Sequence, residues 1–339
     1  MNNKCTVYIG NGFDVACGFR TKYSQFIESD IFINHTEESK LAKWILEKYN
    51  EDKDKWSDLE ELLYLYSINM RKNILDNSLF QKETDIFRNN YRDLVLVLQK
   101  YIANQYSSSG NGFVPSLVRS WHSCFNIDAV CCFNYTPYVV LEKVLPDYVK
   151  LARIHGELMP QVMEDEVKVK LGIDRCMKVC KEHEFLYKDT MGRYGFGVWA
   201  QPDNKLVASA KMVQAQLRPM FYNSDYIIIY GCSLGRSDTA YYKYLFENTK
   251  SQTILLYHYG VSEKETVVKR IKELSPRFNV ERDVIFIDSS FNNGYCEDLQ
   301  GIIETHNMLN AKRKTWISHT NKECKSDYVS PPCHQNIKV

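Results

Sequence analysis

Glycines and small polar residues near the N-terminus have the spacing of a turn that binds phosphate groups. An apolar run over residues 5–10 enters this turn, and Gly18 follows it. Glycines let backbone N–H groups approach a pyrophosphate, and the start of a helix offers unpaired N–H groups and a positive dipole end. The sequence therefore predicts a strand–turn–helix that binds a nucleotide. Its predicted contacts are Gly10, Asn11, Gly12, Phe13 and Asp14.

This turn differs from the G-x-G-x-x-G fingerprint of dehydrogenases. Position 15 holds valine rather than glycine. The chain then continues into helices instead of a second strand with a ribose-binding acid about 20 residues further on. The pattern argues against hydride transfer. Two plainer interpretations stay open, a tight turn that binds no ligand and a role for Asp14 as a helix cap.

Two later apolar runs, over 127–133 and 149–154, also end at polar residues. The first run is followed by Asn134 and Thr136, and the second by His155. Binding and catalytic residues are often carried by such loops. Asn134 as the cap of a predicted helix over 137–145, and His155 as a histidine bonded to the backbone, remain alternatives.

A fourth apolar run, over 225–230, ends in a further glycine-containing segment. In a nucleotide site, Gly231, Ser233 and Asp238 would bind the adenosine half at the start of the next helix. Their simpler role is to cap that helix.

The same segment also fits the G-x-S-x-G nucleophile elbow of α/β-hydrolases. In that interpretation Ser233 is the nucleophile, and Asp288 and His306 follow in the chain order of a triad. Against it, an upstream His-Gly-Gly-Gly oxyanion segment is missing, and the first glycine turn would stay unexplained.

Apolar periodicity places these segments in a Rossmann-like α/β fold with a parallel sheet. Apolar residues spaced by three and four predict an all-helical insertion over about 37–108. The sequence thus indicates one nucleotide-binding domain over 1–311 and a polar, flexible tail over 312–339. The remaining elements are a long connection over 160–205, helices over 211–221, up to 248 and over 263–274, and strands over 253–259 and 284–287.

Composition excludes several classes of function. The 339 residues carry 43 Lys and Arg against 42 Asp and Glu, so no direct nucleic-acid binding is expected. No run approaches the roughly 18 to 20 apolar residues that span a bilayer. The 11 cysteines, an odd number without a signal-peptide pattern, indicate reduced thiols and a cytoplasmic protein. Cys176, Cys180 and His183 supply three metal ligands without an evident fourth, so no metal is expected.

Several short segments resemble known families. The opening turn, Tyr23-Ser24-Gln25-Phe26, Trp56-Ser57-Asp58-Leu59-Glu60 and Asn134-Tyr135-Thr136 resemble the AbiH family of bacteriophage abortive-infection proteins, from the N-terminus to about residue 300. The opening turn, Phe133-Asn134, His155-Gly156 and Gly231-Cys232-Ser233-Leu234 together also resemble the sirtuin catalytic-domain pattern. This resemblance implies a sirtuin-like, NAD-binding fold.

AbiH-type proteins are similar in turn to sirtuin-like NAD hydrolases of phage defence, in which an asparagine and a histidine of these motifs carry the reaction. The resemblance therefore implies Asn134 and His155 as catalytic residues. Breaking the nicotinamide glycosidic bond needs a positioned water and a proton acceptor near neutral pKa, roles that suit an amide and an imidazole. Thr136 stands where sirtuins have aspartate, and the paired C-x-x-C zinc motifs of deacylases are missing.

The expected function is therefore NAD⁺ glycohydrolase activity, giving nicotinamide and ADP-ribose, in anti-phage abortive infection. The expected partners are NAD and either a second copy of the chain or another protein of the defence system. One alternative is a non-catalytic module that senses NAD or ADP-ribose. Another, less favoured, is the serine hydrolase that uses Ser233.

Overall fold

The computed structural model of the chain divides into two compact units, Met1–Tyr295 and Cys296–Val339. The first unit contains the sheet, and the second contains a helix over residues 299–311. Most of the predicted helix over 137–145, the connection over 160–205 with its Cys176, Cys180 and His183, and the tail lie outside the described residues. The structure describes residues 3–51, 59, 62–63, 66, 77–108, 115–136, 141, 149–155, 217–218, 220, 222–235, 238–290 and 298–311.

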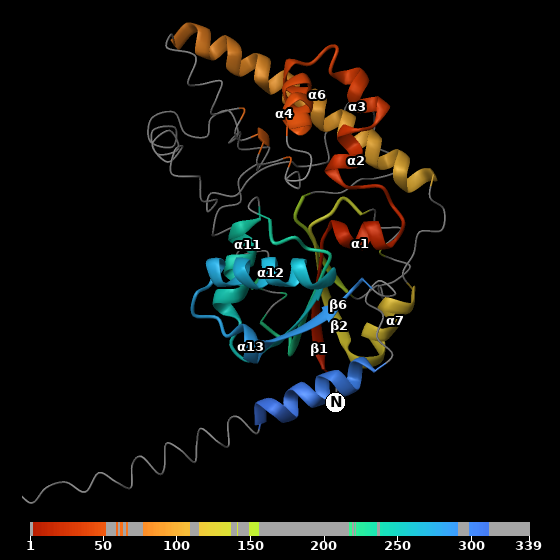
Figure 1. Cartoon of the computed structure of the whole chain (residues 1–339), viewed down its shortest axis with the longest axis vertical. Helices are drawn as coiled ribbons and strands as arrows, with labels where there is room; N and C mark the ends of the chain where they lie inside the picture. Colours follow the sequence, from red (N-terminus) through yellow and green to blue (C-terminus); the bar gives the residue numbers. More distant parts are fainter. Residues whose placement is uncertain are drawn as a thin grey trace, which may run out of the picture. The chain divides into compact units, whose positions relative to one another are not determined.

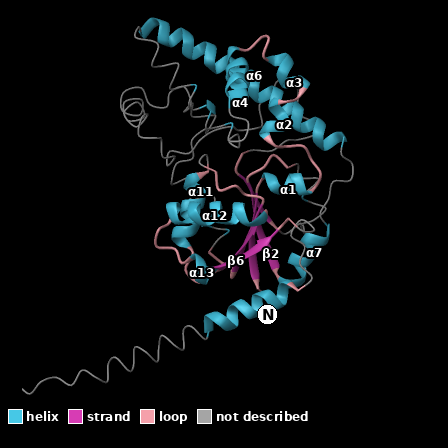
Figure 2. Ribbon diagram, in the orientation of Figure 1, coloured by secondary structure: helices cyan, strands magenta, loops and turns pink. Residues whose placement is uncertain are grey.

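Six parallel strands form the sheet, as Figure 2 shows in magenta. Their order is β3-β2-β1-β4-β5-β6, which confirms the predicted Rossmann-like α/β fold. The chain moves outward from β1 in both directions, so the connections after β1 and β4 diverge and leave a crevice at the carboxyl ends of these strands. The strands are β1 (Lys4–Ile9), β2 (Asn126–Cys132), β3 (Lys150–Arg153), β4 (Tyr226–Tyr230), β5 (Thr253–His258) and β6 (Val284–Asp288).

Helices cover both faces of the sheet, which explains why its central strands are continuous apolar runs. On one face, α11 (Thr239–Asn248) and α12 (Gly260–Leu274) pack with alternate strand residues such as Ile227 and Ile229. On the other face, α7 (Pro115–Cys124) buries Trp121, whose Nε1 donates to the Tyr257 hydroxyl at 2.9 Å. Two short helices, α1 (Asn11–Ala16) and α13 (Val280–Asp283), follow β1 and precede β6. The helices of both faces appear around the strands in Figure 1.

Four helices that follow α1 in the chain form a separate helical layer with its own core. Two of them, α4 (Lys40–Glu51) and α6 (Asn77–Ser108), lie where the periodicity predicts helices. The other two, α2 (Tyr23–Ile27) and α3 (Asp30–His35), are too short to show a period, and the sequence pattern does not predict them. All four share one apolar core, which includes Phe26, Phe32, Ile45, Leu94 and Leu98. None of the helices in the described part of the chain has the length and apolarity to cross a membrane.

The turns that follow β1 and β4 are in direct backbone contact. Gly10 N donates to Tyr230 O and Gly12 N donates to Gly231 O, both at 2.9 Å. A Cβ on Gly10 would lie 2.4 Å from Gly231 O, and a Cβ on Gly12 would lie 2.5 Å from Gly231 Cα. Gly231 itself has a φ of +65°, which favours glycine. These glycines are therefore needed for the close approach of two backbones, and the Gly10 and Gly12 amides already have acceptors.

We expect Gly12→Ala to destabilise the fold by about 3 kcal/mol, the upper part of the range for overpacking against backbone that cannot retreat. The matched control is Gly260→Ala. Gly260 has a φ of +73° and open space around it, so its substitution should cost only the roughly 1 kcal/mol of a left-handed alanine. Urea denaturation of both variants measures the difference. An equal loss of stability in the two variants would contradict the packing argument.

Candidate functional site

A cavity of about 1270 Å³ opens at the carboxyl edge of the sheet, where the connections after β1 and β4 diverge. Open α/β sheets bind their ligands at this place. Two predicted contacts do not line the cavity, because Phe13 packs edge-on against Tyr230 and Thr136 is buried behind the wall. Nine predicted residues do line it: Gly10, Asn11, Gly12, Asp14, Asn134, His155, Gly231, Ser233 and Asp238.

The Asn134 side chain, directly after β2, is oriented by the first glycine turn. Its Nδ2 donates to Gly10 O at 2.7 Å, and only 3% of the residue is exposed. The Gly10 carbonyl oxygen can accept a hydrogen bond from the NH₂ end of the Asn134 amide but not from its oxygen. This bond therefore sets the orientation of the amide and directs Oδ1 away from Gly10 O. Oδ1 is buried and has no hydrogen-bond partner among the described residues. An acceptor left unpaired costs roughly 1–3 kcal/mol, so we expect a water molecule or a ligand to donate a hydrogen bond to it.

His155 lies two residues after the end of β3 and pairs with Asp238. Its Nε2 lies 3.0 Å from Asp238 Oδ1, and the two side chains are 12% and 15% exposed. The rings of Phe133 and Tyr135 flank the imidazole, each with its centroid 6.3 Å away. The sequence predicts Asp238 as a contact for adenosine. The fold also makes it the partner of a histidine 83 residues away.

Asp14 is a buried carboxyl group in the wall of the cavity. Its oxygens accept hydrogen bonds from the hydroxyls of Thr136 and Tyr106, each at 2.6 Å. Burial raises the pKa of Asp14 to about 6, although both hydroxyls and Asn134 act to lower it. The N-cap of α1 is Gly10, so Asp14 is not a helix cap.

Two residues that contact Asp14 or Thr136, namely Tyr106 and Arg153, are not predicted by the sequence. Tyr106 lies on α6, and its hydroxyl donates to Asp14, so a residue of the helical layer contacts the site. Burial, together with the charge of Asp14, raises the pKa of Tyr106 well above its usual value. Arg153, in β3, donates from Nη1 to Thr136 O at 2.6 Å. Periodicity marks Tyr106 only as a helical residue, so no local signal separates it from the other aromatic residues of the insertion.

The contacts of Ser233 do not support a nucleophile elbow. Ser233 is exposed, and the positive φ of +52° belongs to Leu234 instead. Asp288 accepts from the backbone amides of Gly260 and Ser290, at 3.1 and 2.9 Å. His306 belongs to the second unit, where its Nε2 contacts Asn310. No hydrogen bond of the described residues joins Ser233 to a histidine.

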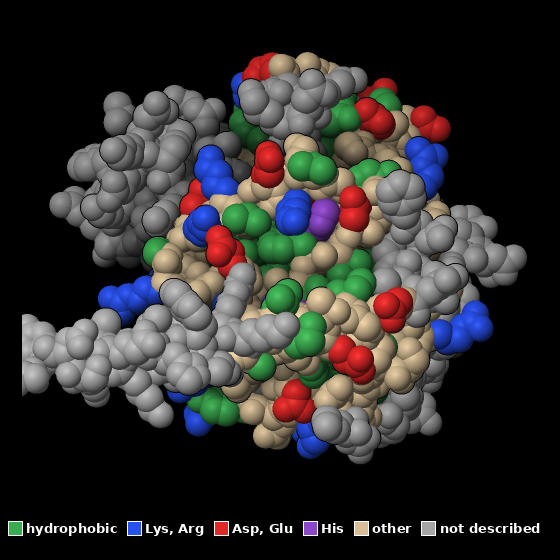
Figure 3. Space-filling model, turned by 60° about the horizontal axis from the view of Figure 1, so that its bottom comes forward, with side chains coloured by type: hydrophobic (Ala, Val, Ile, Leu, Met, Phe, Trp, Pro, Cys, Tyr) green, Lys and Arg blue, Asp and Glu red, His purple; other side chains and the backbone are tan. Residues whose placement is uncertain are grey.

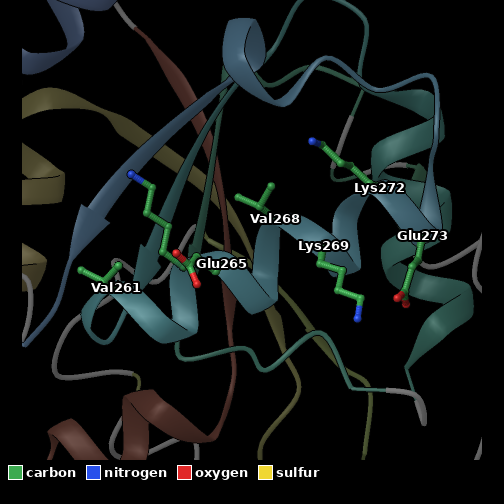
Figure 4. A pocket seen from close by; sticks show the side chains of 7 residues that line it. Val261, Glu265, Val268, Lys269, Lys272 and Glu273 are labelled. Atoms are coloured by element: carbon green, nitrogen blue, oxygen red, sulfur yellow. The ribbon is translucent and has the colours of Figure 1, made fainter.

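The rest of the described surface offers less chemistry. A second hollow of about 760 Å³ is lined by side chains of α12 alone (Figure 4). Lysines and arginines are interspersed with acidic residues on the face shown in Figure 3, without a field of one sign. Within the described ranges, no group of three or more His, Cys, Asp or Glu side chains could hold a metal ion. The cavity at the carboxyl edge is therefore the strongest candidate site.

The fold and the cavity define a Rossmann-like α/β protein with a candidate ligand site at the switch point of its sheet. The family model described as bacteriophage abortive infection AbiH matches residues 7–259, which is more than half of the chain. The chain belongs to the AbiH family, as its sequence segments predict, and this membership gives it a role in phage abortive infection. The comparison with curated proteins gave no match.

The raised pKa of Asp14 predicts how stability changes with pH. Its folded-state pKa of about 6 lies above the usual 3.8, so the folded state binds this proton more tightly. Between pH 4 and 6, the free energy of unfolding should fall as pH rises, by about 1.4 kcal/mol for each pH unit. Asp14→Asn removes this term. Urea denaturation of wild type and variant at pH 4, 5 and 6 should give diverging curves, whereas parallel curves would refute the assignment.

Proposed function

We propose that this AbiH protein hydrolyses NAD⁺ to nicotinamide and ADP-ribose during abortive infection. One observation carries the proposal. Asn134, whose buried Oδ1 has no hydrogen-bond partner among the described residues, and the His155–Asp238 pair line one cavity at the switch point of a dinucleotide-binding topology. The sequence resemblance to sirtuin-like NAD hydrolases supplies the reaction type. Loss of NAD would then halt growth of the infected cell.

The cavity has room for a dinucleotide. Its volume of about 1270 Å³ exceeds the roughly 300–1,000 Å³ of ordinary small-molecule sites. Gly231 and Ser233 lie at the carboxyl end of β4 and suit the adenosine half. His155 and Asn134 follow β3 and β2, on the other side of β1, and suit the nicotinamide riboside half. This orientation places the scissile bond beside the amide and the imidazole.

The reaction breaks the bond between ribose C1′ and the nicotinamide nitrogen. The electron pair of that bond leaves with nicotinamide, which becomes neutral, and the ribose acquires oxocarbenium character. Water then forms the new bond to C1′, and His155 accepts the proton that water loses. Oδ1 of Asn134 accepts a hydrogen bond from the attacking water or from a ribose hydroxyl, and so holds the reacting groups in place.

In this mechanism, Asp238 sets which ring nitrogen of His155 carries the proton. A carboxylate accepts a hydrogen bond, so its contact with Nε2 at 3.0 Å favours the tautomer with the proton on Nε2. Nδ1 is then the basic nitrogen. When His155 takes up the proton from water, the Asp238 charge stabilises the resulting imidazolium, as carboxylates do beside other catalytic histidines.

We expect both His155→Ala and Asn134→Ala to lower turnover of NAD by about 100-fold or more, the usual contribution of a positioned base. Release of nicotinamide from purified protein measures turnover, and calorimetry measures binding of NAD. His122→Ala, an exposed histidine on α7, is the matched control and should keep full activity. Turnover that survives both substitutions would refute the mechanism.

The same measurements distinguish the other functions. A wild-type protein that binds NAD but releases no nicotinamide would be a sensor of the nucleotide. Full activity of Ser233→Ala, and no labelling of wild type by a fluorophosphonate, would exclude the serine hydrolase.

A further inference from the structure

Leu234 adopts a backbone conformation that leucine rarely takes. It has a φ of +52°, and it is the non-glycine residue with positive φ among those the structure describes. A left-handed conformation costs an L-residue roughly 1–2 kcal/mol. It persists only where surrounding contacts hold it. Leu234 is 1% exposed, and it lies in the loop between β4 and α11 that also carries Asp238.

Arg270 of α12 supplies contacts to this loop. Its Nε donates to Leu234 O at 3.0 Å, and its Nη2 donates to the Thr239 hydroxyl at 2.7 Å. Thr239 is the first residue of α11 and directly follows Asp238. One guanidinium group therefore bonds to the loop on both sides of Asp238. Nη1 lies 3.2 Å from Oε2 of Glu273, three residues further along α12, so the guanidinium is itself held.

We propose that Arg270 is a positioning residue for the reaction, which acts by holding Asp238 against His155. The left-handed turn at Leu234 and the start of α11 at Thr239 set the direction of the Asp238 side chain. Asp238 in turn sets the tautomer of His155 through their 3.0 Å contact. The kinetic part of this inference rests on the proposed hydrolase activity, whereas its structural part does not.

Arginine is suited to this task by its shape. The planar guanidinium presents five N–H donors in a fixed fork, so it can reach a carbonyl and a hydroxyl at the same time. Lysine keeps the charge, but its three donors share one nitrogen at the end of a flexible stem, so they cannot match the fork. Arg270 also lines the cavity, so a direct contact with a substrate phosphate is the rival explanation. The kinetic constants separate the two, because loss of a phosphate contact weakens substrate binding and raises KM, whereas a misplaced Asp238 lowers kcat.

The kinetic test is a double-mutant cycle of Arg270→Lys with Asp238→Asn. We expect Arg270→Lys to lower kcat by roughly 10- to 100-fold, as misplaced catalytic groups do, with little change in KM. In the Asp238→Asn background the same substitution should cost almost nothing further. Arg282→Lys, an arginine of α13 that pairs with Asp283, is the matched control. Independent losses in the cycle, or a higher KM with unchanged kcat, would overturn the proposal.

A second readout does not need turnover. In protein with ¹⁵N-labelled histidine, His155→Gln assigns the imidazole resonances of His155. If Arg270 positions Asp238, these resonances in Arg270→Lys move toward their values in Asp238→Asn. Resonances that stay at the wild-type position overturn the proposal. If the protein releases no nicotinamide but the His155 resonances move as expected, the hydrolase activity is refuted and the positioning role of Arg270 is supported.

Thr239→Val provides a variant that is milder than the loss of the guanidinium. It removes the hydrogen bond from Nη2 to the Thr239 hydroxyl and keeps the arginine, its contact with Leu234 and its pair with Glu273. If Arg270→Lys does not fold, Thr239→Val should move the His155 resonances in the same direction by a smaller amount. Unmoved resonances in this folded variant overturn the proposal equally.

Discussion

The site depends on the close backbone contact between the turn after β1 and the turn after β4. Two hydrogen bonds of 2.9 Å join Gly10 and Gly12 to the end of β4 and to Gly231, and no side chain separates the two backbones. The Gly10 carbonyl then accepts from Asn134, so one residue takes part in both the contact and the site. A shift of either turn by a few tenths of an ångström would therefore also move the amide. Glycine occupies these positions because a Cβ would prevent the contact.

Buried polar groups connect this contact to the rest of the molecule. Asp14 follows the first turn and lies in the wall of the cavity, where its charge would be costly without hydrogen bonds. Thr136 comes from the segment after β2, and Tyr106 comes from α6. The helical layer is thus part of the support of the site, because removal of the Tyr106 hydroxyl would leave a buried carboxylate with one donor fewer.

The histidine is held by a residue that follows a strand on the other side of β1. His155 follows β3 at the edge, whereas Asp238 follows β4, which lies beyond β2 and β1. Their contact joins segments that follow strands on the two sides of β1, and Arg270 bonds to the loop that carries Asp238. Asn134 is oriented by the first turn, and His155 by the loop after β4. The two proposed catalytic groups are therefore held by different segments, the turn after β1 and the loop after β4. These two segments contact each other at Gly12 and Gly231.

The sequence by itself determined the parallel α/β architecture, the strand boundaries to within one or two residues, and the polar residues at the strand ends. These features are local, because apolar runs, glycine turns and periodicity are written in neighbouring residues. It also identified the family, through short segments that resemble AbiH proteins. It did not reveal the short helices α2 and α3, which contain too few residues to display a period.

Only the tertiary structure decided which of those residues meet. The order of the strands brings Asp238 to His155, Tyr106 to Asp14 and Arg270 to Leu234, over separations of 83, 92 and 36 residues. It also gave the glycines a reason other than nucleotide binding, and it placed Thr136 behind the wall of the cavity rather than on it. Such contacts depend on how distant strands and helices pack, and no local pattern in the chain encodes that arrangement.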